Sequence, residues 1–248
     1  MQSGLHPSIH AFQASQWDAL NPSAYPGLLH GFLSALEDSK SVGEGTGWTP
    51  LYAAVKDGDA LVGAMVCFLK SDSYGEYVFD WSWADAYHRH GLNYYPKCVT
   101  AIPFTPATGP RLLIQDGYDR GVVTELLIKT LKSELSDQVS SWHILFPDEE
   151  TSRDLLTQGS WLKRHGVQFH WFNQGFETFD DHLATFNSKR RKEARRERRR
   201  VQEQGIEFER LSGHAIDREA LETLFQCYQM TYRVRGSRGY LTREFFEL

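Results

Sequence analysis

The chain has few cysteines and no long apolar run. Its three cysteines, Cys67, Cys98 and Cys227, are scattered over 248 residues, and an odd, dispersed set predicts no disulfide framework. No apolar run reaches the roughly 20 residues that a membrane-spanning helix needs. The N-terminus lacks the basic segment and apolar core of a signal peptide. These absences predict a chain without an integral membrane segment, and we expect a cytoplasmic location.

The motifs of several catalytic classes are also missing. His88 and His90 have no third ligand at a suitable spacing, so no metal site is predicted. No Gly-x-Ser-x-Gly motif or Cys/His arrangement supports covalent catalysis. The turn at 115–121 comes nearest to a pyrophosphate-binding loop of acyl-CoA, but its spacing differs, and Asp116 and Asp119 would repel phosphate. A plain strand-to-helix turn is the simpler interpretation.

A basic block at 189–200 interrupts an otherwise acidic sequence. Nine of its twelve residues are Lys or Arg and two are Glu, a local charge of +7, whereas the rest of the chain carries 18 basic and 30 acidic residues. That remainder would repel a polyanion, and no motif of stacking aromatic residues accompanies the block, so we predict no nucleic-acid partner.

Several interpretations of the block stay open. It can be a solvated helix that joins two units, with Glu and Arg side chains paired three or four positions apart. Its first turn, with Lys189, Arg191 and Lys192, can instead hold a phosphate or diphosphate at the positive end of the helix dipole. Contact with RNA or an acidic membrane is the remaining interpretation.

Periodicity predicts strands that alternate with helices. Strands are expected at 51–55, 61–69, 111–114, 141–146, 167–173 and 206–211. Helices are expected at 28–36, 122–135, 148–158, 179–186, 188–204 and 216–232. The sequence Asp57-Gly58-Asp59 predicts a hairpin between the first two strands. The alternation indicates an α/β or α+β sheet protein.

The order of these elements predicts a first domain at 1–186, a basic linking helix at 187–205 and an incomplete second unit at 206–248. Gly205 is a suitable residue to end the helix. The residues after it are too few to bury a core alone, and the sequence stops inside an expected helix. We therefore expect a truncated chain.

Single residues offer candidates for a binding site. Asp80 lies between Phe79 and Trp81, where a buried carboxylate must be paired or shifted in pKa. Asp80 and Asp85 can line a pocket in the aromatic segment 74–83, although a buried aromatic core explains that segment as well.

Other candidates would contact an anion. Tyr94, Tyr95 and Lys97 flank a proline, and Arg111 follows a proline-rich loop. His143 and His170 fall in predicted strands, where core histidines outnumber catalytic ones. His170 is kept among the candidates.

Ten short segments occur in the order found in one bacterial family. They are 30–37 (HGFLSALE), 69–71, 74–81 (YGEYVFDW), 83–87 (WADAY), 94–97 (YYPK), 103–111 (PFTPATGPR), 145–147, 168–171 (QFHW), 188–192 (SKRRK) and 240–246 (YLTREFF). With them the chain resembles the Fem-like, FemAB-related proteins of the GNAT acyltransferase superfamily, which are described as peptidoglycan biosynthesis/recognition proteins.

This resemblance implies two GNAT-like domains, the first with a mixed sheet and flanking helices, of which the chain holds the first and the opening of the second. The implied activity is transfer of an acyl group, N-acetyl or aminoacyl, to an amine of a cell-envelope precursor or similar anionic metabolite. Acyl-CoA, such as acetyl-CoA, is a donor that the resemblance allows. The alternatives are a non-catalytic recognition domain for a phosphorylated ligand, or an inactive truncated product.

The residues predicted to bind substrate are Asp80, Asp85, Tyr95, Lys97, Arg111, His170, Lys189, Arg191 and Lys192. The catalytic residues are not assigned. The expected partner is a small molecule or a cell-wall precursor.

Overall fold

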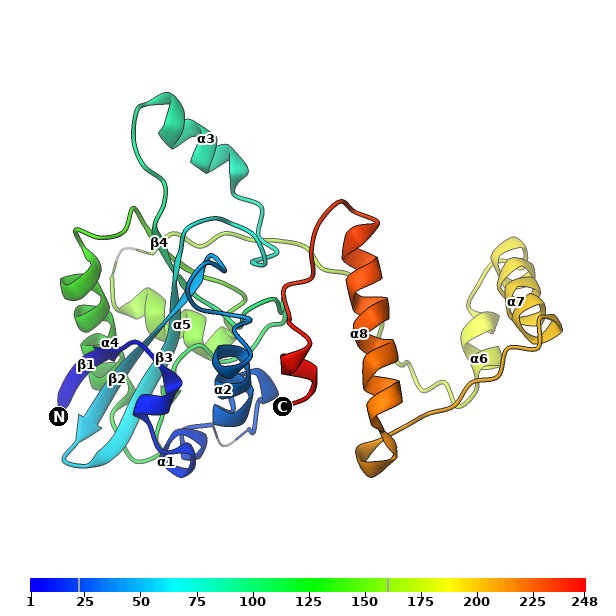
Figure 1. Ribbon diagram of the computed structural model, residues 1–248, viewed down its shortest axis with the longest axis horizontal. Coiled ribbons are helices and arrows are strands. Elements are labelled where there is room, and N and C mark those ends of the chain that lie inside the picture. The colour runs from blue at the N-terminus through cyan, green and yellow to red at the C-terminus, as the bar shows by residue number, and fades with distance from the viewer. Residues whose placement is uncertain (22, 160) are drawn as a thin grey trace. The chain divides into compact units, whose positions relative to one another are not determined.

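A computed structural model describes residues 1–21, 23–159 and 161–248. The chain divides into two compact units: unit 1 contains residues 1–161 and 221–248, and unit 2 contains residues 162–220. Unit 1 is built on a mixed sheet with flanking helices, which confirms the predicted α/β (α+β) class (Figure 1). The domains predicted at 1–186, 187–205 and 206–248 stay a prediction. A division of the chain into compact units does not show where the domains of a protein family begin and end.

The sheet is mostly antiparallel. Its strands are β1 (Gln2–His6), β2 (Trp48–Asp57), β3 (Ala60–Lys70), β4 (Lys97–Thr100), β5 (Leu113–Ile114) and β6 (Trp142–Ile144). The order is β1-β2-β3-β4-β6, with β5 also paired to β3, and β4 pairs with β6 in parallel. The predicted hairpin is confirmed, because Asp57 pairs with Ala60 and Gly58 takes a φ of +58° in the two-residue turn.

Six helices agree with the predicted ranges, whereas α1 (Ala14–Ala19) and α3 (Trp81–Arg89) were not among the predicted helices. The six are α2 (His30–Asp38), α4 (Arg120–Leu135), α5 (Glu149–Thr157), α6 (Phe179–Ala184), α7 (Ser188–Glu203) and α8 (Arg218–Arg233). Short 3-10 turns lie at η1 (Ile9–Ala11), η2 (Pro26–Leu28), η3 (Gly213–Ala215) and η4 (Glu244–Phe246). No helix in the described ranges is both long and apolar enough to cross a membrane.

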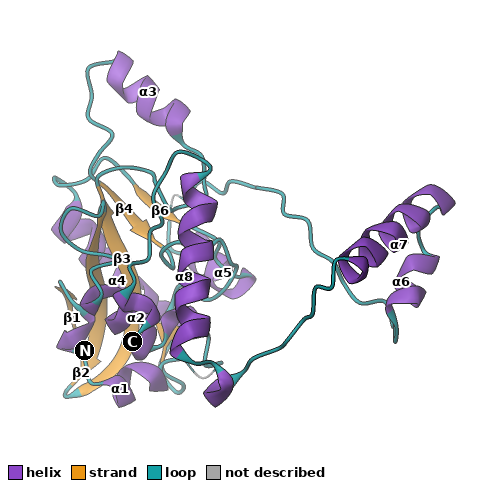
Figure 2. Cartoon of the chain, turned by 45° about the vertical axis from the view of Figure 1, so that its right-hand side comes forward, coloured by secondary structure: helices purple, strands orange, loops and turns teal. Residues whose placement is uncertain are grey.

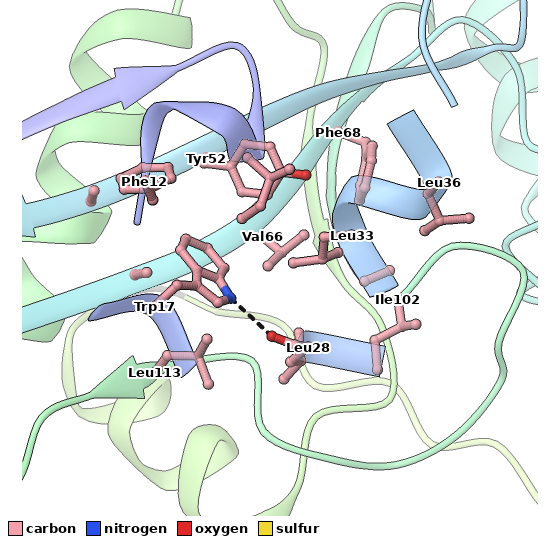
Figure 3. Packing of buried hydrophobic residues seen from close by; sticks show 14 of the residues in the cluster. Phe12, Trp17, Leu28, Leu33, Leu36, Tyr52, Val66, Phe68, Ile102 and Leu113 are labelled. Carbon is pink, nitrogen blue, oxygen red and sulfur yellow. Dashed lines mark hydrogen bonds between the residues drawn. The ribbon is translucent and has the colours of Figure 1, made fainter. Parts of the chain in front are cut away.

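Unit 1 buries one apolar layer on each face of the sheet. Along β2, Tyr52 and Ala54 point into one layer, whereas Ala53 and Val55 point into the other, as the two-residue period of a strand requires. In the first layer Trp17 donates a hydrogen bond from its indole nitrogen to the carbonyl of Leu28, 2.9 Å away (Figure 3). The second layer is covered by α4.

Four predictions of secondary structure are wrong or incomplete. Residues 167–173 and 206–211 are loops, not strands. Their alternating pattern has no partner strand in the described part of the chain, and apolar side chains such as Phe169 and Phe208 are exposed. In contrast, the N-terminus expected to be irregular forms β1, and 97–100 forms the unpredicted β4. Both strands depend on pairing with distant residues, which a local pattern does not reveal.

Unit 2 is a pair of helices with extended flanks. In both views α6 lies beside α7 (Figures 1 and 2). Thr178 and Asp181 form a reciprocal capping box at the start of α6. The helix predicted at 188–204 is confirmed as α7, and Gly205 follows it with a φ of +68°.

Candidate functional site

Two lysines lie directly opposite each other in the sheet of unit 1. Lys70 ends β3, Lys97 begins β4, and the register pairs the two residues. Both side chains are fully buried. Like charges on opposite positions of neighbouring strands destabilise a sheet, and a buried ammonium group needs charged or polar partners. The surrounding loop must therefore supply carboxylates.

Two buried carboxylates bind Lys97. Its ammonium group donates to Ser73 Oγ at 2.9 Å, to Glu76 Oε2 at 2.8 Å and to Asp80 Oδ2. The hydroxyl of Tyr94 donates to the same oxygen of Asp80 at 2.6 Å. Lys97 also lies 5.2 Å from the centre of the Tyr94 ring. This buried cluster of Ser73, Glu76, Asp80, Tyr94 and Lys97 links β4 to the loop that leads into α3.

The pKa values of the two carboxyl groups shift in opposite directions. Burial by itself would raise the pKa of Asp80, but hydrogen bonds from Lys97 and Tyr94 to its carboxylate outweigh burial and leave the pKa below its usual value. Burial raises the pKa of Glu76, and the hydrogen bond from Lys97 offsets this only in part. Glu76 Oε1 and Asp80 Oδ1 have no hydrogen-bond partner among the described residues. Glu76 is consequently the carboxyl group of the pair that takes up a proton first.

Lys70, opposite Lys97 in the sheet, extends the buried cluster to the partly exposed Asp72. Its ammonium group lies 4.0 Å from the Trp48 ring and donates to Asp72 Oδ1 at 3.3 Å and to the carbonyl of Tyr74 at 3.2 Å. Burial lowers the pKa of Lys70 to about 8, against the opposing effect of Asp72. The carbonyl of Tyr74 also accepts a hydrogen bond from Trp48 Nε1 at 3.0 Å, and its amide donates to Asp72. The cluster thereby fixes the backbone of Tyr74, whose side chain is exposed.

Tyr74 lines a groove of about 750 Å³ in unit 1. The other lining residues are Lys40, Ser41, Thr46, Phe104, Arg233, Gly236, Ser237, Arg238, Gly239 and Tyr240. The rings of Phe104 and Tyr240 stack with their centres 4.8 Å apart and their planes 4° apart. Within the described residues, the lining holds three cationic side chains and no acidic one, so it favours an anionic group.

The three cations of the groove are Lys40, Arg233 and Arg238. Among the described residues none of them forms an ion pair. A cation without a carboxylate partner remains available to a ligand, and arginine can bind a phosphate or carboxylate through two hydrogen bonds.

The groove forms because residues about 200 positions apart in the sequence are in contact. The amide of Thr242 donates to Ser41 Oγ at 3.1 Å, and the Thr242 hydroxyl donates to the carbonyl of Ser39 at 2.9 Å. Tyr228 accepts hydrogen bonds from the amides of residues 240 and 241, which holds the turn after α8 in place. The loop after α2 and the segment after α8 therefore contact each other, and both line the groove.

Three of the predicted site residues come together in the buried cluster. Asp80 binds Lys97, and the hydroxyl of Tyr95 lies 2.7 Å from Ser73 Oγ, which Lys97 also contacts. Asp85 lies apart from them, exposed on α3 and paired with Arg89 at 3.1 Å.

The remaining predicted residues lie elsewhere. The buried guanidinium of Arg111 donates to the carbonyls of residues 107, 110 and 145, so it holds a loop together. His170 is exposed in an extended segment, 6.0 Å from the Phe172 ring. Lys189, Arg191 and Lys192 lie on α7 in unit 2. A role of these residues in substrate binding stays a prediction.

Sequence reasoning missed Lys70 and Glu76 as partners in the cluster, and it missed the groove. A signal for Lys70 was present, since a lysine that ends an eleven-residue apolar strand requires a compensating partner. The groove left no local signal, because its basic residues come from segments that are distant in the sequence.

The structure does not favour acyl-CoA binding at the turn before α4. The carboxylate of Asp119 caps this helix and accepts a hydrogen bond from the amide of Val122 at 3.1 Å. It occupies an amide that would hold a pyrophosphate and adds a negative charge there. These residues do not fit the CoA pyrophosphate. Within the described residues, no group of three His, Cys, Asp or Glu side chains could hold a metal ion.

Comparison with known families agrees with the resemblance seen in the sequence. Residues 8–248 match the FemAB-like family, which is described as peptidoglycan biosynthesis/recognition. The chain therefore belongs to this family. No curated protein and no solved structure matches the chain.

Proposed function

We propose that the protein is an acyl or aminoacyl transferase that acts on an amine of a peptidoglycan precursor and binds an anionic group of this substrate in the groove of unit 1. Membership of the FemAB-like family supports a role in peptidoglycan biosynthesis and, broadly, a transferase. The observation that carries the binding site is a set of three cations, Lys40, Arg233 and Arg238, which have no ion-pair partner among the described residues and line a groove to which those residues contribute no acidic side chain.

The reaction requires that the acyl donor and the amine are held in a fixed orientation to each other. An amine nitrogen attacks the carbonyl carbon of an activated acyl group and forms the new C–N bond, while donors stabilise the negative charge on the carbonyl oxygen and a base takes a proton from the nitrogen. When the carbonyl re-forms, the bond from its carbon to the donor's sulfur or oxygen breaks, and the donor leaves as a thiol or alcohol after it takes up a proton. In this proposal the groove cations bind the anionic group, and Tyr74, Phe104 and Tyr240 pack against a ring or apolar portion of the ligand. Lys70 acts as a positioning residue, because it holds the backbone of Tyr74.

A second candidate function is recognition of the same anionic ligand without chemistry. Among the residues that the structure describes, the groove lining contains no Asp, Glu or His that could accept the proton of the attacking amine. This observation favours a domain that binds a phosphorylated precursor without transferring a group to it.

Ligand binding to an Arg238→Glu variant tests the groove. We expect UDP-N-acetylmuramoyl-pentapeptide to raise the Tm of the native chain, and Arg238→Glu to weaken its binding by about tenfold or more, since an ion pair is replaced by a repulsion. Isothermal titration calorimetry measures the Kd of each variant. Arg235→Glu is the matched control, because Arg235 lies in the same turn, carries the same charge and does not line the groove.

Mass spectrometry of the precursor after incubation with an acyl or aminoacyl donor separates the two candidates. A mass increase on the precursor supports a transferase. Binding without any mass increase, across acetyl-CoA and aminoacyl donors, favours recognition. If the precursor does not bind to the native chain, or if Arg235→Glu weakens binding as much as Arg238→Glu, the groove is not its site.

A further inference from the structure

Unit 2 has the opposite charge to unit 1. It contains 13 basic and 10 acidic residues, a net charge of +3, whereas unit 1 contains 14 basic and 22 acidic residues, a net charge of −8. The positive charge of unit 2 is concentrated on α7, and that helix has no buried residue. Unit 2 therefore presents a separate basic surface.

One face of α7 uses its arginines to hold α6. These residues are Arg191, Arg195 and Arg198. The first donates to the carbonyl of Leu183 at 3.0 Å, and the second pairs with Asp180 at 3.0 Å. The guanidinium of the third lies 4.1 Å from the centre of the Phe179 ring. Their spacing of four and three residues places all three on one side of the helix.

Five of the other six basic residues of α7, all except Arg190, form a second stripe. It consists of Lys189, Lys192, Arg196, Arg199 and Arg200. Their spacing of three and four residues places them on one face, beside the face whose arginines hold α6. All five are exposed. Within the described residues only Arg196 has an ion-pair partner, Glu193 at 4.0 Å. This basic stripe performs no structural task that the fold reveals.

Exposed apolar side chains flank the helix pair on both sides in the sequence. They are Leu162, Val167, Phe169, Trp171 and Phe172 before α6, and Ile206, Phe208, Leu211 and Ile216 after α7. Phe169 is 99% exposed and Phe208 is 86% exposed. Trp171 lies 5.5 Å from the His182 ring on α6, which ties the first group to the helices. So many exposed apolar residues in a short stretch indicate a contact surface.

The charge of the basic stripe and the chemistry of the exposed apolar side chains together indicate which partner unit 2 binds. A stripe of five exposed cations favours an anionic partner, and a second copy of unit 2 would oppose it with the same charge. Aromatic residues can stack on nucleic-acid bases, but five of the nine flanking residues are aliphatic and cannot. Basic residues together with Trp, Phe and aliphatic side chains are the combination that binds the interface of a bilayer with anionic lipids. In unit 2 the cations lie on α7 and the apolar side chains lie in the segments beside the helices.

We propose that unit 2 docks the protein on an anionic lipid surface. The basic stripe of α7 contacts the headgroups, and the apolar side chains of the flanking segments enter the boundary between headgroups and acyl chains. This inference is independent of the proposed groove ligand, because none of its residues lines the groove.

Co-sedimentation of the full chain with vesicles tests the proposal. We expect binding to vesicles of phosphatidylcholine and phosphatidylglycerol in equal parts, little binding to phosphatidylcholine alone, and weaker binding as salt is added. Lys192→Glu combined with Arg199→Glu should lower the partition coefficient by at least about tenfold, because each basic residue near an anionic surface contributes measurably to binding. Lys129→Glu combined with Arg153→Glu makes the same change of charge at exposed sites of unit 1 and should bind like the native chain.

A second pair of variants tests the apolar contribution. Phe169→Ser combined with Phe208→Ser should weaken binding and leave its dependence on salt intact. Circular dichroism checks that α7 stays helical, and Lys192→Gln with Arg199→Gln should give an intermediate loss if the charge-reversed variant does not fold. Equal binding to both kinds of vesicle, no loss in either α7 variant, or absence of vesicle binding would overturn the proposal. Binding to a single-stranded RNA oligonucleotide instead of vesicles would assign the stripe to nucleic acid.

Discussion

At the scale of single residues, the buried cluster is held by a balance between desolvation and pairing. Taking an ammonium group and two carboxylates out of water costs several kcal/mol for each ion, and the pairs repay this cost only while every partner is present. Lys97 is the centre of the balance, because it contacts Ser73, Glu76 and Asp80. Removal of one partner should therefore be worse than removal of all charges.

We predict that Lys97→Met destabilises unit 1 by about 3–5 kcal/mol, because it leaves Glu76 and Asp80 buried without a cation. Urea unfolding followed by circular dichroism measures the free energy. A triple variant that adds Glu76→Gln and Asp80→Asn should recover part of the loss. Lys129→Met, at an exposed position, should change the stability little. A Lys97→Met chain as stable as the native one would show that the cluster is not held by this lysine.

Asp80 shows how much of the buried cluster could be predicted from a single residue in the sequence. Asp80 could be singled out because a carboxylate between two aromatic residues needs a partner if it is buried, and the structure confirms both its burial and its pairing. Its partner could not be derived in the same way. The pairing of Lys70 with Lys97 depends on the register between two strands, and that register is a property of the folded sheet.

At the scale of elements, the contact between β3 and α4 depends on a glycine, Gly63, which has no side chain. A Cβ atom at Gly63 would lie 2.3 Å from Val123 Cγ1, in the layer where α4 covers the sheet. We predict that Gly63→Ala destabilises the protein by about 1–3 kcal/mol, since the helix must shift away from the strand. Urea unfolding measures this change.

Gly4→Ala is the matched control for this contact. Gly4 also lies in a strand, β1, but nothing lies within 4 Å of a Cβ atom added there. Its substitution should leave the stability nearly unchanged or raise it slightly, because alanine restricts the unfolded chain. Equal losses in the two variants would mean that the cost comes from the strand backbone and not from the approach of α4.

Elements were predictable to the extent that they are local. The helix expected at 122–135 and the hairpin around Gly58 are determined by periodicity and turn chemistry within a short window, and both are present. Residues 206–211 have an equally clear alternation but no partner strand in the described chain, so they stay extended and unpaired. β1 shows the reverse case, because its pairing with β2, and not its own pattern, makes it a strand.

At the scale of the whole molecule, unit 1 is discontinuous. Residues 221–248 belong to it although 59 residues of unit 2 precede them in the sequence. Phe245 packs against Phe32 with ring centres 5.8 Å apart, and Tyr240 stacks on Phe104. The groove depends on this return of the chain, since Arg233 and Arg238 come from the second part of unit 1.

We predict that the two parts of unit 1 stay together after the chain between them is cut. Recognition sequences of a specific protease, inserted after Gly166 and after Glu209, lie in exposed loops of unit 2. After cleavage, the N-terminal and C-terminal fragments should co-elute in size-exclusion chromatography, because apolar rings and the hydrogen bonds of Thr242 join them. The same cut in a chain with Thr242→Ala and Phe245→Ala should release the C-terminal fragment. If the fragments of the native chain separate as readily, these contacts do not hold Arg233, Arg238 and Tyr240 at the groove, and ligand binding there would have to depend on Lys40 and its neighbours alone.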